Sequence, residues 1–271
     1  MTTDSVAPVA LITGASSGFG REAALALRDH GWSVFGASRH PAAPEVDGIH
    51  MLPLDVRDPI SVNQCVSQCL ARAQRLDVLV NNAGYVMNGF TEEASLEEAH
   101  AIFETNFFGL VRMTNAVLPH FRQQRAGRII NVSSLAGRLG APYRAYYCPT
   151  KFAVEGYSES LALELHPFNI HVSLIEPGFF QTNLSNASAH VAHTLADYDS
   201  FRTRLHDYFV RSIRSGGDPA VVGRLIARVA ACPRPKLRYR AGRDAKFLLF
   251  FRSLLPERLF LAGGRKYFHI P

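Results

Sequence analysis

The chain has few cysteines and no long apolar segment. Its 271 residues include four cysteines, too few for a disulfide framework in a chain long enough to bury a core of its own. No apolar run approaches the roughly 18 residues that a membrane-spanning helix needs. The first nine residues carry Asp4 and no basic residue, which is not the pattern of a secretory signal peptide. These absences favour a reduced, cytoplasmic setting.

Lysine is also scarce, and charge is distributed unevenly. Only four lysines are present, so most of the positive charge is arginine. Residues 1–199 carry 13 basic and 19 acidic side chains, whereas residues 200–271 carry 16 basic and 4 acidic ones. Such a basic segment can attract nucleic acid, an anionic membrane or an acidic substrate. With 47% hydrophobic residues, the composition is otherwise that of an ordinary globular protein.

Apolar β-type runs alternate with helical patterns through the first two thirds of the chain, which is typical of a parallel sheet built from βαβ units. Strands are predicted at residues 9–13, 33–37, 49–52, 78–80, 128–132, 171–175 and 237–241. Helices are predicted at residues 19–29, 60–73, 96–121 (one or two helices), 149–165 and 220–231. Residues 181–217 are polar and helix-like, without strands. The pattern predicts one α/β domain over residues 1–271, with a core at 1–185 and a basic, substrate-covering part at 186–271.

A glycine-rich turn lies between the first predicted strand and the first predicted helix. Its residues are Thr13, Gly14, Ala15, Ser16, Ser17, Gly18, Phe19 and Gly20. Glycines allow a tight turn and let backbone N–H groups approach a pyrophosphate at the positive end of a helix. The spacing is not the general G-x-G-x-x-G fingerprint, so the motif alone leaves a plain glycine turn open. The strand–turn–helix context favours dinucleotide binding.

The end of the second predicted strand indicates which dinucleotide to expect. About 20 residues after such a turn, an acidic residue would bond a free ribose 2′-hydroxyl, whereas an arginine would accommodate a 2′-phosphate. Here the sequence has Ser38 and Arg39 and no acidic residue, and a guanidinium offers two parallel hydrogen bonds to a phosphate. We therefore expect NADP(H) rather than NAD(H), with a solvated loop arginine as the alternative.

Tyr147 and Lys151 stand four residues apart at the start of a predicted helix, which places a phenol and an ammonium on one face. A nearby cation lowers a phenol's pKa from about 10, so this tyrosine is a candidate general acid and base. Ser134 lies at the end of the fifth predicted strand, where ligands bind in open α/β sheets. Pro149 fits only a first helical turn, so this helix is predicted to begin near Cys148, whose thiol we interpret as buried and inert.

These residues belong to a larger set by which the chain resembles the classical short-chain dehydrogenase/reductase (SDR) family. The set spans roughly residues 7–185 in the family's order and spacing: Thr13-Gly14-x-x-x-Gly18-x-Gly20, Asn81-Asn82-Ala83-Gly84, Asn106, Ser134, Tyr147-x-x-x-Lys151 and Pro177-Gly178-x-x-x-Thr182. Six elements at fixed offsets are more specific than any one alone. The resemblance implies a Rossmann-type doubly wound parallel sheet of about seven strands, with helices on both faces and a helical C-terminal lid. It also implies a homodimer or homotetramer.

The resemblance further implies roles for individual residues. Tyr147 would donate a proton to a carbonyl oxygen or accept one from an alcohol, and Ser134 would polarise that oxygen. Lys151 would bond the nicotinamide ribose and lower the tyrosine pKa, while Asn106 would hold a water linking Lys151 to solvent. Asp55 would contact adenine. The implied cofactor contacts are Thr13, Gly14, Ser16, Ser17, Gly18, Phe19, Gly20, Ser38, Arg39, Asp55, Val56, Asn82, Ala83, Gly84, Tyr147, Lys151, Pro177, Gly178, Phe180 and Thr182. No metal is implied.

The loops after the predicted strands are expected to form the substrate pocket. They carry apolar and aromatic side chains without clustered charge: Tyr85, Met87, Phe90, Leu135, Leu139, Tyr143, Phe179 and Phe180. This favours a small hydrophobic carbonyl or alcohol, steroid-, retinoid- or lipid-like, in keeping with the 17β-hydroxysteroid and retinol dehydrogenase branch of the family; about half of these aromatics could instead be core. An anionic lipid or acyl-carrier ketone stays open, because the arginines of the C-terminal part could meet a charged head group.

Other functions stay open on the sequence. A non-catalytic dinucleotide sensor could use the same scaffold, although a sensor has no need of a general acid. No recognised motif supports nucleic-acid binding, and the aromatic residues at 198–209 have the spacing of a lid helix. His190 and His193 lack a third metal ligand nearby. The mixed apolar and basic stretch at 246–258 predicts docking on the body, on a second subunit, or peripherally on an anionic membrane.

Overall fold

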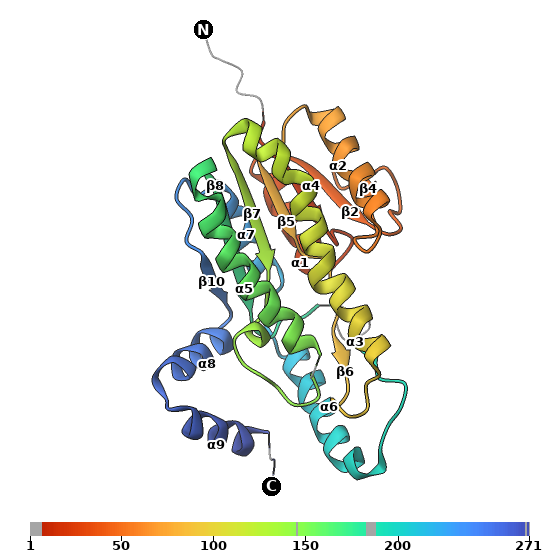
Figure 1. Cartoon of the computed structure of the whole chain (residues 1–271), viewed down its shortest axis with the longest axis vertical. Helices are drawn as coiled ribbons and strands as arrows, with labels where there is room; N and C mark the ends of the chain where they lie inside the picture. Colours follow the sequence, from red (N-terminus) through yellow and green to blue (C-terminus); the bar gives the residue numbers. More distant parts are fainter. Residues whose placement is uncertain (1–6, 145, 183–187, 269, 271) are drawn as a thin grey trace.

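An eight-stranded sheet forms the centre of the computed structural model, which describes residues 7–144, 146–182, 188–268 and 270 (Figure 1). The strand order is β10-β8-β7-β5-β1-β2-β4-β3. Every neighbouring pair is parallel except β3 and β4, which are antiparallel. The Rossmann-type doubly wound sheet is thereby confirmed, and the eighth strand is a two-residue addition to the seven expected. The predicted boundary between residues 185 and 186 lies outside the described residues.

The strands match the predicted positions closely. Those of the large sheet are β1 (Val9–Thr13), β2 (Ser33–Ser38), β3 (Glu45–Val46), β4 (Ile49–Pro53), β5 (Val78–Asn81), β7 (Gly127–Val132), β8 (Ile170–Pro177) and β10 (Arg238–Ala241). A second, two-stranded sheet pairs β6 (Met87–Asn88) with β9 (Ala189–His190). The expectation that residues 181–217 hold no strand is therefore wrong. A two-residue strand has no periodicity by which the sequence could indicate it.

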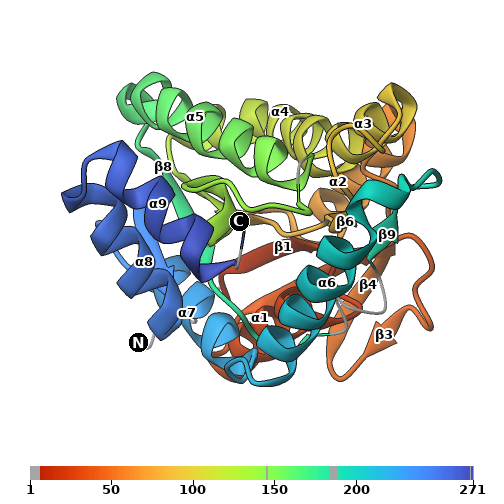
Figure 2. The ribbon, with the colours of Figure 1, turned by 90° about the horizontal axis from the view of Figure 1, so that it is seen from below.

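Helices cover both faces of the large sheet (Figure 2). The described α-helices are α1 (Gly18–Asp29), α2 (Pro59–Ala73), α3 (Leu96–Phe103), α4 (Gly109–Gln124), α5 (Tyr147–Leu165), α6 (Asp199–Arg214), α7 (Ala220–Ala231), α8 (Arg243–Leu254) and α9 (Glu257–Tyr267). Helix α5 begins two residues before the predicted start, so Pro149 is its third residue and lies in the first turn, as expected. Helices α8 and α9 were not among the helices predicted by residue range.

Two apolar cores hold these layers together. One packs α2, α4 and α5 against one face of the sheet, with Leu11 among the strand residues that point into it. The other packs α1 and α7 against the opposite face, where Ile12 points. Successive residues of β1 thus enter different cores, as the two-residue repeat of a strand requires. All five residues of β1 are buried, which is typical of a parallel strand covered on both faces.

The strand order reverses at β1, which has β2 on one side and β5 on the other. Ligands of open α/β sheets bind outside the carboxyl ends of the strands at such a switch point. Figure 1 shows α6, α8 and α9 at this same end of the sheet. Helix α8 packs Ala245 and Leu249 against Leu135. None of the described helices is long and apolar enough to cross a membrane.

Candidate active site

The glycine turn is shaped by close backbone approaches. Gly14 and Gly18 have φ angles of 68° and 54°, a region that residues with a Cβ rarely adopt. The Thr13 hydroxyl accepts hydrogen bonds from the backbone N–H groups of Asn82 and Ala83, each at 3.0 Å. The Asn82 side-chain amide donates to the carbonyl oxygens of Thr13 and Gly14, at 2.9 and 3.1 Å. The turn after β1 is therefore fastened to the end of β5.

Helix α1 begins with donors that no side chain caps. Ser17 is its N-cap residue but makes no side-chain capping bond, and the first turn contains no acidic residue. Gly20 is buried, and a Cβ there would meet the Gly14 carbonyl oxygen at 2.3 Å. The first turn therefore lies directly against the glycine turn, with its N–H groups and positive dipole end available to an anion.

A cavity of about 600 Å³ opens in front of this helix terminus. Most of the predicted cofactor residues line it: Gly14, Ser16, Ser17, Gly18, Phe19, Ser38, Arg39, Asp55, Val56, Asn82, Ala83, Gly84, Tyr147, Lys151 and Thr182. Thr13 and Gly20 do not line it, because they lie behind the turn and shape it. Pro177, Gly178 and Phe180 line a neighbouring apolar cavity instead.

Two arginines and one carboxylate lie at the end of this cavity near β2 and β4. Arg57 donates to Asp55 through Nε at 3.0 Å and Nη2 at 2.6 Å. This hydrogen bonding lowers the Asp55 pKa to about 2, and the charge of Arg39 also lowers it. Arg39 has no ion-pair partner among the described residues, and the buried Ser38 hydroxyl lacks a hydrogen-bond partner there. The chain offers this end of the cavity a free guanidinium and a free hydroxyl, which fit a phosphate.

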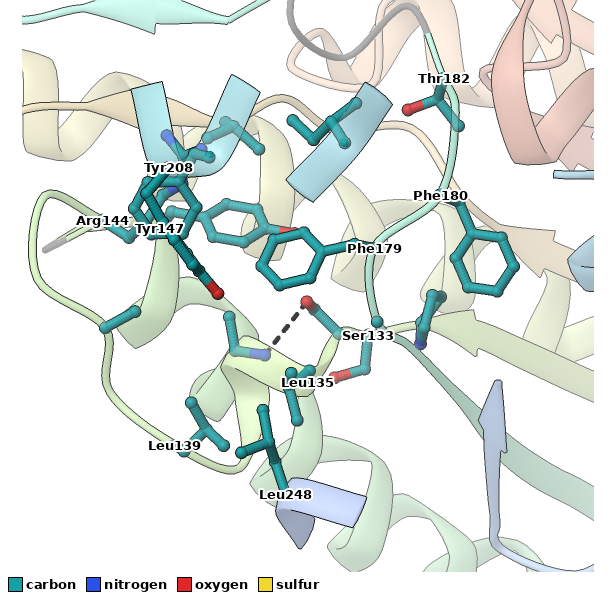
Figure 3. A pocket seen from close by; sticks show the side chains of 18 of the residues that line it. Ser133, Leu135, Leu139, Arg144, Tyr147, Phe179, Phe180, Thr182, Tyr208 and Leu248 are labelled. Carbon is teal, nitrogen blue, oxygen red and sulfur yellow. Dashed lines mark hydrogen bonds between the residues drawn. The ribbon is translucent and has the colours of Figure 1, made fainter. Parts of the chain in front are cut away.

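Tyr147, Ser134 and Lys151 meet where β7 ends and α5 begins. The Ser134 hydroxyl accepts from the backbone N–H of Ala136 at 3.1 Å, drawn as the dashed line in Figure 3. Lys151 is buried and donates from Nζ to the Val132 carbonyl oxygen at 2.9 Å. Its Nζ lies 5.9 Å from the centre of the Tyr147 ring. Three of the four predicted catalytic side chains are thus gathered at one point of the site.

The pKa values of these groups differ from the expectation. Burial raises the pKa of Tyr147, and this outweighs the opposing effects of the Ser134 hydroxyl and of Arg144. Burial also lowers the Lys151 pKa to about 8, against the raising effect of Glu155. The expected net lowering of the Tyr147 pKa is therefore not found, because burial dominates, and the role of Lys151 toward this tyrosine stays a prediction. Tyr147 holds its proton at neutral pH.

Asn106 lies in a π-helical turn, Glu104–Phe108, that joins α3 to α4. Its side chain accepts from the backbone N–H of Tyr85 and donates to the Tyr85 carbonyl oxygen, both at 2.9 Å. It also donates to the Thr150 hydroxyl at 3.3 Å, next in sequence to Lys151. Asn106 therefore anchors the loop after β5 beside the catalytic helix, and its water-holding role stays a prediction.

A second cavity, of about 120 Å³, shares Phe19, Ser133, Tyr147 and Thr182 with the first (Figure 3). Its other lining residues are Val86, Ser134, Leu135, Ala136, Leu139, Ala141, Arg144, Pro177, Gly178, Phe179, Phe180, Tyr208, Phe209, Ile213, Leu248, Tyr267 and Phe268. Helices α6, α8 and α9 all contribute to this lining. Tyr147 thus stands between a polar cavity at the glycine turn and an apolar one under the C-terminal helices.

Four of the eight predicted pocket residues line the apolar cavity, namely Leu135, Leu139, Phe179 and Phe180. Tyr85 lines the larger cavity instead. Met87 is buried in β6, and Phe90 and Tyr143 belong to a buried cluster with Leu205 and Phe209. The assignment of these three to the pocket is wrong, because Phe90 and Tyr143 pack behind it on Phe209 and Met87 is buried in β6.

Sequence reasoning missed two basic residues of the site. Arg57 follows Asp55 by two residues, and the neighbouring ends of β2 and β4 bring it to the cavity of Arg39. Arg144 lies three residues before Tyr147, lines the apolar cavity and is 8% exposed. The one sequence feature that could have pointed to Arg144 as a site residue is its position three residues before Tyr147.

The remaining candidates, His190, His193 and Cys148, line neither cavity. No group of three or more potential metal ligands occurs among the described residues; the ring of His190 lies 6.0 Å from that of His206. Burial raises the Cys148 pKa, which keeps the thiol protonated and agrees with its interpretation as inert.

Comparisons with known proteins agree with this geometry. The family model for short chain dehydrogenases matches residues 8–191. The chain is 40% identical over 270 residues to a 3-ketodihydrosphingosine reductase of Bacteroides thetaiotaomicron, covering 97% of this chain and 98% of the relative. It is 35% identical over 269 residues to retinol dehydrogenase 8 of Bos taurus, covering 91% and 85%. The crystal structure of a short-chain dehydrogenase from Streptomyces avermitilis, 35% identical, has a TM-score of 0.81 and covers 95% of this chain and 98% of that one. The chain belongs to the short-chain dehydrogenase/reductase family.

Proposed function

We propose that this oxidoreductase uses NADP(H) to interconvert a hydrophobic ketone or aldehyde and the corresponding alcohol. The observation that carries the proposal is the position of Tyr147 in the shared wall of two cavities. One cavity has the glycine turn and an uncapped helix terminus, and the other has an apolar lining. A proton donor between a dinucleotide site and a substrate site is the arrangement that hydride transfer to a carbonyl needs.

The bound dinucleotide would supply or accept the hydride. The backbone N–H groups of the glycine turn and of the first turn of α1 would bind its pyrophosphate. Ser134 and Tyr147 would hold the substrate oxygen, and the Tyr147 hydroxyl would give it a proton as negative charge develops. Burial keeps Tyr147 protonated at neutral pH, which is the state from which it can donate a proton to a carbonyl oxygen. Lys151, whose Nζ lies 5.9 Å from the centre of the Tyr147 ring, would orient the dinucleotide.

The preference for NADP(H) rests on the free groups at the end of β2. Solved structures of the family hold NAD in one case and NADP in another, so the fold alone does not decide between them. In this chain Arg39 and the Ser38 hydroxyl have no partners among the described residues, whereas Arg57 is held by Asp55. A 2′-phosphate would pair with Arg39, and NAD(H) would leave that guanidinium without an anion.

The substrate class follows from the apolar cavity. Leucine and phenylalanine side chains dominate its lining, and α6, α8 and α9 cover it. A relative in Bacteroides is named for reducing 3-ketodihydrosphingosine, and one in cattle is named as a retinol dehydrogenase. These names, together with the lining, support a lipid-like or other hydrophobic carbonyl compound as the substrate.

Helices α8 and α9 also support peripheral contact with a membrane. Leu248 and Tyr267 line the cavity, while Phe247 and Phe250 of α8 are 62% and 54% exposed. Basic residues accompany them along both helices: Arg243, Lys246, Arg252, Arg258, Arg265 and Lys266. Exposed aromatic rings among basic side chains suit the interface of an anionic bilayer. Such contact would place the cavity beside a store of apolar substrate.

The predicted homodimer or homotetramer draws support from another surface. Phe108, Phe152 and Leu163, on the helices that carry the catalytic residues, are 46%, 47% and 77% exposed. Large apolar side chains gathered on one side of a protein often mark an interaction surface. Sedimentation of the purified protein tests this association, and a monomer at micromolar concentration would contradict it.

The experiment that tests the proposed function is a carbonyl panel. Purified protein is mixed with NADPH or NADH and with steroid, retinoid and long-chain ketones or aldehydes, and oxidation of the dinucleotide is followed by its absorbance. We expect turnover of apolar carbonyl compounds with NADPH as the better reductant. Binding of NADPH without turnover of any carbonyl would contradict the proposal and support a dinucleotide sensor.

A further inference from the structure

Arg144 is a buried cation in the wall of the apolar cavity. It lies just before α5, where its carbonyl oxygen accepts from the backbone N–H of Cys148 at 3.0 Å. The side chain is 8% exposed, and its Cζ lies 4.0 Å from the centre of the Phe209 ring. Figure 3 draws it among the side chains that line this cavity, with Tyr147 and Tyr208. Its Nη1 atom is buried and has no hydrogen-bond partner among the described residues.

Among the described residues, Arg144 has no carboxylate partner. Its pKa is influenced by Tyr147, Cys148 and Tyr143, all neutral at pH 7, and its own charge lowers the pKa of His190 nearby. Burial lowers the Arg144 pKa to about 10, which leaves the guanidinium protonated at neutral pH. A buried guanidinium without an anion is unfavourable, so one is expected only where something other than stability retains it.

Other partly buried arginines of the same region are paired. Arg202 approaches Glu93 at 2.6 Å, and Arg238 approaches Glu155 at 3.0 Å. Both pairs tie C-terminal segments to the body of the protein. Arg144 differs from them because it faces a cavity in place of a carboxylate. A bound ligand can therefore supply the anionic partner that Arg144 lacks among the described residues.

We propose that Arg144 forms a substrate subsite for a carboxylate close to the reacting carbonyl group. This inference rests on the proposed function, because it places the carbonyl at Tyr147, three residues further along the chain and in the same cavity wall. A guanidinium binds a carboxylate through two charge-assisted hydrogen bonds. The substrate class is then an amphiphilic keto acid, with its apolar chain among the leucine and phenylalanine side chains. An ammonium group at the same position would be repelled.

Three matched ketones test this subsite: a medium-chain γ-keto acid, its neutral methyl ester, and the γ-keto amine with an ammonium in place of the carboxylate. We expect wild-type kcat/KM to be highest for the acid and lowest for the amine. In Arg144→Met, which keeps the packing on Phe209, kcat/KM for the acid should fall about 10- to 100-fold, mainly through KM. The value for the ester should change less than about threefold, and Arg144→Lys should retain part of the preference for the acid.

Two controls separate this role from others. The Tm of Arg144→Met should equal or exceed that of the wild type, since an uncompensated buried charge is removed; a lower Tm would indicate a structural role. Equal loss of activity toward acid and ester would mean that Arg144 acts through Tyr147, and would overturn the proposal. A wild-type preference for the amine would also overturn it.

The proposed function and the subsite can fail separately. If wild type turned over none of the three ketones with either dinucleotide, the proposed function would fail for this substrate class. Calorimetry would still measure how tightly the γ-keto acid binds to the protein in the presence of NADPH, and so would test whether Arg144 binds the carboxylate. If the acid binds to the wild type and not to Arg144→Met, the subsite is supported. Equal binding to both proteins overturns it.

Discussion

Gly20→Ala should damage the glycine turn through one misplaced methyl group. That methyl would stand 2.3 Å from the Gly14 carbonyl oxygen and 2.5 Å from the Asn82 amide nitrogen, about 1 Å closer than atoms of these kinds can approach. Relief of such a clash costs about 1–3 kcal/mol. Loss of the two Asn82 hydrogen bonds adds about 1 kcal/mol each, and alanine's better helix propensity returns about 0.5–1 kcal/mol. The free energy of unfolding should therefore fall by about 2–4.5 kcal/mol.

The assay is urea denaturation together with NADPH titration, and Gly156→Ala is the matched control. Gly156 is an exposed residue of α5, and a Cβ there meets no atom within 4 Å. The control should gain up to about 1 kcal/mol and bind NADPH as the wild type does. Gly20→Ala should in addition bind NADPH at least about tenfold more weakly, because the helix terminus is displaced. Unchanged stability and affinity in Gly20→Ala would refute this account of the turn.

Three further predictions concern the cofactor, the buried lysine and the C-terminal helices. Arg39→Asp should weaken NADPH binding about 100-fold and NADH binding less than about threefold, by fluorescence titration; equal weakening would contradict the 2′-phosphate assignment. Because the Lys151 pKa is about 8 in the folded state against 10.5 in the unfolded state, the folded protein loses this proton first. The free energy of unfolding of the wild type, measured relative to that of Lys151→Met, should therefore rise by up to about 3 kcal/mol between pH 8 and 10.5. If urea denaturation gave the same difference between the two proteins at every pH, this prediction would be contradicted. Co-sedimentation with vesicles containing anionic lipid should be salt-sensitive and lost when Phe247 and Phe250 become Ser, but kept in Phe152→Ser on α5.

The sequence predicted the large elements of the fold because their signals are long. Helix α7 has the predicted bounds, and each strand of the parallel sheet of four or more residues lies where an apolar run predicted it. The elements that the sequence did not predict are short or depend on tertiary contacts. The π-helical turn at Asn106 replaces a simple helix junction because the Asn106 side chain binds the backbone of Tyr85. Strands β6 and β9 exist only as partners of each other.

The site was predictable where a motif implied it and not where folding brings distant segments together. The glycine turn, Tyr147 and Lys151 were found by spacing, and the structure gathers them around one cavity. The charge environment of Tyr147 was not predictable, because it depends on burial and on Arg144. The aromatic spacing at 198–209 predicted the lid helix, and α6 supplies Tyr208 and Phe209 to the lining. The lining supplied by α8 and α9 depends on how these helices pack, for which the sequence offers no motif.

The charge of the basic C-terminal part is partly accounted for by its contacts. Arg202 binds Glu93, and Arg238 lies among the buried or partly exposed carboxylates of Glu155, Glu159 and Glu176. Part of the excess positive charge therefore fastens this segment to the acidic body of the protein. The arginines and lysines of α8 and α9 that have no such partner among the described residues remain available to a membrane or a substrate.

The most direct test of the central claim compares Tyr147→Phe with Tyr146→Phe, its neighbour in sequence. Both variants keep the aromatic ring, but only the first removes the hydroxyl that would donate the proton. Tyr147→Phe should bind NADPH with wild-type affinity and reduce the best ketone at least about 1,000-fold more slowly, while Tyr146→Phe should keep its rate within about threefold. Full turnover by Tyr147→Phe would contradict the account.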